Sequence, residues 1–213
     1  MKCVLCDQRK AKRFCPAKRA LICPQCCGEK RVLEIDCPET CEYLKAGRQR
    51  DISEHAKYLR GMDEAQRVRS QRIIREHQEI LARLEFVLGQ QRLSMRGLTD
   101  RQVWTAINIL LETYRTEEKG ILYDRTSEDL NVEAVRLELH GVIERLRNPE
   151  GEQNTRIVDP QVNRLSLGTA IECLEFMRSM IDAYMNRRAE SGYVDLLARL
   201  CPREQKPGSI ILP

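Results

Sequence analysis

Eight of the ten cysteines in the 213-residue chain lie within its first 41 positions. Their spacing reads C-x2-C-x8-C-x7-C-x2-C-C-x9-C-x3-C. Eight thiols is the number that two tetrahedral all-cysteine zinc sites require, and a two-residue gap between cysteines is typical of zinc-binding turns. Such gaps separate Cys3 from Cys6 and Cys23 from Cys26. The sequence therefore predicts two Zn²⁺ ions per chain.

The neighbouring cysteines Cys26 and Cys27 restrict how the ligands can be shared between the two ions. Adjacent side chains in an extended segment point to opposite faces, so we expect these two thiols to bind different ions. The first predicted site comprises Cys3, Cys6, Cys23 and Cys26, and the second comprises Cys15, Cys27, Cys37 and Cys41. A sequential assignment is the alternative, although it would split or crowd the adjacent pair. Four cysteine ligands leave no position open for water, which predicts structural rather than catalytic zinc.

Disulfides and an iron–sulfur cluster are two other uses of clustered cysteines. The N-terminus lacks the apolar segment of a secretory signal, so we expect a cytoplasmic protein with reduced thiols. An iron–sulfur cluster would leave four thiols without a role. A segment of fewer than 50 residues buries little apolar surface, and a structural zinc ion can supply on the order of 10 kcal/mol toward its folding. These considerations favour zinc.

The order of these cysteines resembles a known type of zinc finger. An opening C-x2-C, a "KAKRFCP" segment, a second C-x2-C and a closing C-x3-C are similar to the interleaved two-zinc fingers of the HIT, MYND and B-box kind. The resemblance covers residues 1–45 and implies a compact module that binds proteins more often than DNA. The segment around Cys15 lacks the second cysteine of the HIT pattern, and a cysteine closes the module where a histidine is usual. The pattern CPxxCCGEKR…CPxxCxYL also resembles a bacterial zinc-finger family, which implies no particular biochemical activity.

The formal charge of +4 invites a nucleic-acid interpretation. Residues 1–50 contain twelve Lys and Arg against six Asp and Glu, but eight thiolates binding two Zn²⁺ ions would change this +6 by −4. Net charge alone is therefore weak evidence for a polyanionic partner. Candidate phosphate contacts lie between the ligands, at Arg9, Lys10, Lys12 and Arg13. The same cations could instead balance the charge of the zinc–thiolate centres.

The rest of the chain is predicted to be helical. Apolar residues recur at seven-residue intervals from Ile52 to Val87, apart from the polar Gln66. This pattern predicts a long helix, with a break near Gly61, and also allows a homodimeric coiled coil. Thr99 and Gln102 form a capping-box pattern before a helix that should stop at Gly120. Further helices are expected over residues 131–147, 166–186 and 193–200, with a polar loop over 148–163. No alternating strand pattern competes.

The predicted organisation is mainly α: a cysteine-rich two-zinc module (1–45), a long connecting helix (46–96) and a helical bundle (97–213). The bundle ends in a short apolar tail, "KPGSIILP". Cys173 falls on an apolar helix face, where we expect a buried small side chain, and Cys201 receives no role.

We find no catalytic motif in the sequence and no apolar run long enough to cross a membrane. The leading hypothesis is a non-enzymatic zinc-binding adaptor that binds another protein. A nucleic-acid-binding regulator that uses the basic segments between the ligands is the first alternative. A thiol-based zinc or redox sensor is the second.

Overall fold

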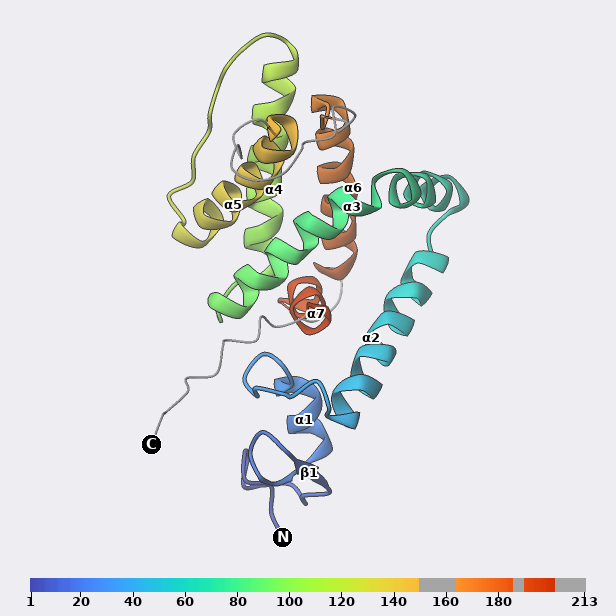
Figure 1. Cartoon of the computed structure of the whole chain (residues 1–213), viewed down its shortest axis with the longest axis vertical. Coiled ribbons are helices and arrows are strands. Elements are labelled where there is room, and N and C mark those ends of the chain that lie inside the picture. The colour runs from blue at the N-terminus through green and yellow to red at the C-terminus, as the bar shows by residue number, and fades with distance from the viewer. Residues whose placement is uncertain (150–163, 186–189, 202–213) are drawn as a thin grey trace.

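The computed structural model describes residues 1–149, 164–185 and 190–201. This part of the chain contains seven helices and one small two-stranded sheet, so the predicted mainly α fold is confirmed. Figure 1 shows the cysteine-rich N-terminal region at one end of the molecule and a group of packed helices at the other. The polar loop after residue 149 and the C-terminal tail lie outside the described residues.

The N-terminal region folds into a hairpin and a short helix. Strands β1 (Arg13–Cys15) and β2 (Ala20–Ile22) pair in antiparallel register, with Phe14 opposite Leu21, and helix α1 (Pro24–Lys30) follows. The sequence predicts no strands in this region and does not exclude them. Strands of three residues are too short to produce an alternating pattern that a sequence could reveal.

Two helices occupy the region predicted as one long helix with a break near Gly61, and the break lies between Arg60 and Glu64. Helix α2 (Glu42–Arg60) leads away from the N-terminal region, and helix α3 (Glu64–Ser94) returns across the molecule (Figure 1). Asp63 caps α3 by accepting a hydrogen bond from the Gln66 N–H at 2.9 Å, which explains why the helix restarts there. Helix α3 is kinked at His77, where φ is −127° and ψ is 25°.

The second half of α3 packs with four further helices. These are α4 (Asp100–Glu118), α5 (Leu130–Arg147), α6 (Leu167–Met185) and α7 (Gly192–Leu200). The predicted capping box is present, because Thr99 accepts from the Gln102 N–H and the Gln102 side chain accepts from the Thr99 N–H.

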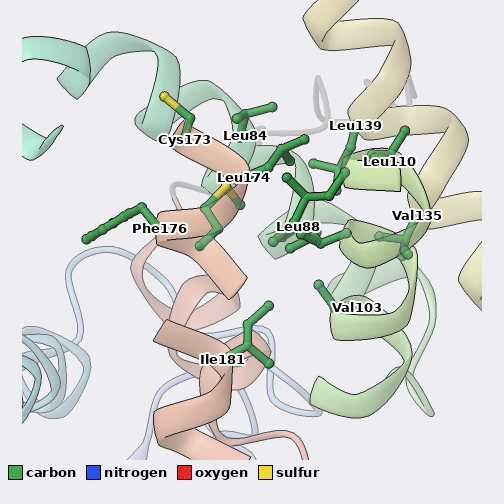
Figure 2. Packing of buried hydrophobic residues seen from close by; sticks show 14 of the residues in the cluster. Leu84, Leu88, Val103, Leu110, Val135, Leu139, Cys173, Leu174, Phe176 and Ile181 are labelled. Carbon is green, nitrogen blue, oxygen red and sulfur yellow. The ribbon is translucent and has the colours of Figure 1, made fainter. Parts of the chain in front are cut away.

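The apolar faces of these helices form one core. Figure 2 shows side chains from α3, α4, α5 and α6 meeting at its centre. Leu84, Leu110 and Leu174 have no exposed surface. Cys173 is fully buried, as predicted, and Cys201 is buried beside α3. Within the described residues, none of the helices is apolar and long enough to cross a membrane.

Candidate metal centre

Four cysteines from two segments of the N-terminal region come together. The thiol sulfur atoms of Cys3, Cys6, Cys23 and Cys26 all lie within 4.8 Å of one another. In a tetrahedral zinc site with Zn–S bonds of about 2.3 Å, the sulfur atoms are about 3.8 Å apart. The four thiols therefore fit a metal ion after small side-chain adjustments. Among the described residues, this is the one group of His, Cys, Asp and Glu side chains positioned to hold a metal.

Backbone N–H groups point at these sulfur atoms. The Cys26 N–H donates to Cys23 Sγ at 3.3 Å, and this bond is the main reason that the pKa of the Cys23 thiol falls to about 6. The N–H groups of Arg9 and Gln8 lower the pKa of Cys6. Hydrogen bonds of this kind favour the thiolate, which is the form that binds metal.

Burial acts in the opposite direction on the innermost thiol of this group. Cys26 is 1% exposed, and its burial raises the pKa of the thiol to about 12. A buried thiolate without a cation is costly, whereas a bound metal ion supplies the missing positive charge. The site as a whole therefore suits a cation that binds sulfur.

Arg9 lies beside the same thiols. Its Nε is 3.5 Å from Cys23 Sγ and its Nη2 is 3.9 Å from Cys26 Sγ, so the guanidinium is directed at two predicted ligands. Donors around metal ligands orient them and tune the metal. From the sequence, Arg9 is a candidate phosphate contact or a cation that balances the charge of the zinc–thiolate centres. Its position in the structure favours the second role, and its location three residues after the first C-x2-C was the only signal.

The adjacent cysteines Cys26 and Cys27 lie at two different places, although not because the segment is extended. Cys26 and Cys27 lie in helix α1 rather than in an extended segment, and successive helical side chains project about 100° apart. Cys26 joins the first group, while Cys27 lines a different cavity. One turn of helix can therefore direct the two thiols to separate places.

The four cysteines of the second predicted site line one small cavity of about 10 Å³. This is the space of about one water-sized sphere. Its lining includes Cys15, Cys27, Cys37 and Cys41. Burial raises the pKa of the Cys37 thiol, and the nearby charges of the other three thiols raise it further. The structure thus brings these four residues around a common space, although their sulfur atoms do not form a metal-holding group like the first.

An unusual backbone conformation occurs next to this cavity. Val32 has a φ of 66°, which is a strained value for a β-branched residue. Its backbone N–H donates a hydrogen bond to the Cys37 thiol. The residue with the strained backbone is thus the one whose N–H is directed at a predicted metal ligand.

The remaining candidate phosphate contacts are distributed over the hairpin. Lys10 and Lys12 are exposed, whereas the Arg13 guanidinium lies over the Tyr43 ring at 4.7 Å from its centre. Among the described residues, neither lysine side chain forms an ion pair or a ring contact, whereas Arg13 does contact a ring.

Arg31, one of the basic residues between the predicted ligands, connects the N-terminal region to α2, a contact that the sequence did not indicate. It lines the second cavity, forms an ion pair with Asp51 and donates to the carbonyl of Gly47 at 3.3 Å. A side chain at position 47 would collide with this guanidinium, because a Cβ there would lie 2.7 Å from the Arg31 Cζ atom. Sequence offers no signal for the contact beyond a glycine within a helix.

Comparison with known protein families, curated proteins and solved structures gave no match for this chain. The zinc-finger-like character of the N-terminal region therefore rests on its own residues, chiefly on the four clustered thiols.

Proposed function

We propose that the protein is a non-enzymatic adaptor whose N-terminal module is built on two structural zinc ions and binds another protein. The cluster of Cys3, Cys6, Cys23 and Cys26 carries the proposal, because four thiols within 4.8 Å complete a tetrahedral zinc shell. A complete shell leaves no position for water or substrate. The zinc ion at this site therefore holds the fold together.

The second zinc ion would occupy the space between Cys15, Cys27, Cys37 and Cys41. Three observations support this: the four residues share one cavity of about 10 Å³, the Val32 N–H is directed at Cys37, and eight thiols match two shells of four. Cys41 immediately precedes helix α2. A metal ion bound there would fix the start of α2 to the hairpin and to α1.

Exposed apolar side chains support an adaptor over an enzyme. Val4 and Phe14 on the module are 58% and 57% exposed. Ile121, Leu122 and Tyr123 are exposed in the connection between α4 and α5, which lies away from the module in Figure 1. Contiguous exposed apolar residues mark protein interaction sites. Two such places on one chain would allow it to hold two partners.

Affinity capture with the intact protein and with a Cys26→Ser, Cys27→Ser variant tests this function. Metal analysis of the intact protein should give two zinc ions per chain. The variant loses a predicted ligand from each site, so the module should unfold and its partners should be lost. The helical body, by which we mean helices α3 to α7, should stay folded, because its core does not include these cysteines.

Two outcomes would contradict the proposal. If both proteins retain the same partners, the module is not the binding surface. If the intact protein holds one zinc ion, or iron, the two-zinc description of the module is wrong.

A further inference from the structure

We propose that the outer face of the β1–β2 hairpin binds an acidic segment of a partner protein that also presents an apolar side chain. This inference names the partner chemistry for the adaptor function and rests on that function. We call the surface the hairpin face. Its residues are Val4, Lys10, Lys12, Phe14, Lys18, Arg19 and Leu21.

Strand register places the apolar residues of the hairpin face together. Phe14 pairs directly with Leu21, and side chains of directly paired residues lie on the same side of an antiparallel sheet. The Val4 N–H donates to the Leu21 carbonyl at 3.4 Å, so Val4 lies on the other side of Leu21. The three residues form a short row, in which Phe14 and Val4 remain more than half exposed.

Unpaired cations surround this apolar row. The Lys12 N–H donates to the Ile22 carbonyl at 3.0 Å, which holds Lys12 beside the hairpin, immediately before β1. Lys10, Lys18 and Arg19 are also exposed. Among the residues that the structure describes, these four make no ion pair, and no ion pair includes a residue before Lys30.

The contrast with the rest of the chain indicates that this charge has an external partner. Residues 1–28 contain seven Lys and Arg but a single acidic residue, Asp7. On the helical body, arginines pair with carboxylates, as Arg72 does with Glu172 at 2.7 Å and Arg136 with Glu133 at 2.7 Å. Five of the eight module thiols are buried and three are partly exposed, so most of the thiolate charge lies away from the lysines that face outward. Charge complementarity therefore selects an acidic ligand.

Protein fits this surface better than nucleic acid. Single-stranded nucleic acids bind to rows of aromatic side chains on which successive bases stack. On the hairpin face Phe14 is the one aromatic residue, and Arg13 occupies one face of the nearby Tyr43 ring. Arg9 is directed at the thiols of Cys23 and Cys26. The hairpin face presents several separated cations around a short apolar row. A peptide with carboxylates around one apolar side chain is complementary to such a surface.

Selection of a displayed library of random linear peptides on the zinc-loaded full chain tests the inference. We expect enrichment of peptides in which Asp or Glu flank an apolar residue. A Lys12→Glu, Lys18→Glu variant should weaken binding of an enriched peptide about tenfold or more and reduce its salt dependence. Phe14→Ser should weaken binding by a similar factor with the salt dependence unchanged.

Matched variants on the helical body control for charge and for apolar surface. Lys119→Glu reverses an exposed cation in the same way, and Leu137→Ser removes a side chain that is 52% exposed. Neither should change peptide binding. All variants should keep the zinc content and circular dichroism of the intact protein, because none of the substituted residues is buried.

Several results would overturn the inference. These are no enrichment, enrichment of peptides without acidic residues, binding that the hairpin variants leave unchanged, and tighter binding of random-sequence single-stranded RNA or DNA that displaces the peptide. If partner capture still depends on Cys26 and Cys27 in that case, the adaptor function stands and only the hairpin face was assigned wrongly. If peptide binding does not depend on the hairpin face and partner capture does not depend on Cys26 and Cys27, the adaptor function is removed as well.

Discussion

Cys23 shows how a single residue is prepared to bind a metal ion. Its thiol accepts hydrogen bonds from the Cys26 N–H at 3.3 Å and from Arg9 Nε at 3.5 Å. Donors from α1 and from the segment before β1 therefore converge on one sulfur atom. Both favour the thiolate. The spacing of the cysteines was enough to predict that the thiols of Cys3, Cys6, Cys23 and Cys26 meet. The position of Arg9 was not predictable, because a long flexible side chain can turn toward the ligands or toward solvent without changing the sequence pattern.

Arg9→Ala should weaken zinc binding at one of the two predicted sites. Removal of a hydrogen-bond donor next to a metal ligand typically costs about ten- to a hundredfold in metal affinity. Lys10→Ala is the control, since Lys10 is an exposed neighbouring cation that makes no contact with a thiol. Competition with a chromophoric chelator measures the zinc affinity of each variant. Equal zinc affinities for the two variants would show that Arg9 does not support the ligands.

Helix α7 depends on a residue from another helix. Asp100, at the start of α4, has no exposed surface and accepts hydrogen bonds from the N–H groups of Tyr193 at 2.9 Å and Val194 at 3.0 Å. These are N–H groups of the first turn of α7, which would otherwise be buried without partners. Burial raises the pKa of Asp100, although both N–H groups oppose the rise. The carboxylate therefore joins α4 to α7.

Asp100→Ala should destabilise the helical body by about 2 to 3 kcal/mol, because two buried N–H groups lose their acceptor. Asp63→Ala is the matched control, since Asp63 caps α3 in the same way from an exposed position. Its loss should cost about 1 kcal/mol or less. Urea unfolding followed by circular dichroism compares them. Equal destabilisation by the two variants would contradict a special role for Asp100.

The elements differ in how far their sequences predicted them. Helices α4 to α7 have apolar residues at helical spacing over two or more turns, and α4 begins with a capping box, so their existence was predictable. The hairpin was not, because three-residue strands carry no periodic signal. Neither was the cap on α7, because Asp100 and Tyr193 are 93 residues apart and either residue alone has many compatible partners.

At the scale of the whole molecule, a few polar contacts connect the module to the helical body. Arg48 of α2 donates through Nε to the carbonyl of Arg199 at the end of α7, at 2.9 Å, and also pairs with Glu39. Arg31 of the module pairs with Asp51 of α2. Figure 1 shows α7 on the side of the helical body that faces the module. The chain order of module and body was predictable, but this arrangement was not, because it depends on contacts between distant charged residues.

We propose that the adjacent cysteines of α1 serve two separate zinc ions. Native mass spectrometry of the intact protein, Cys26→Ser and Cys27→Ser, combined with mapping of the thiols that react with a maleimide, measures this directly. We predict two zinc ions in the intact protein and one in each variant. In Cys26→Ser the second set, Cys15, Cys27, Cys37 and Cys41, should stay protected, and in Cys27→Ser the first set should. Exposure of the same four thiols in both variants, or a single zinc ion in the intact protein, would contradict the claim.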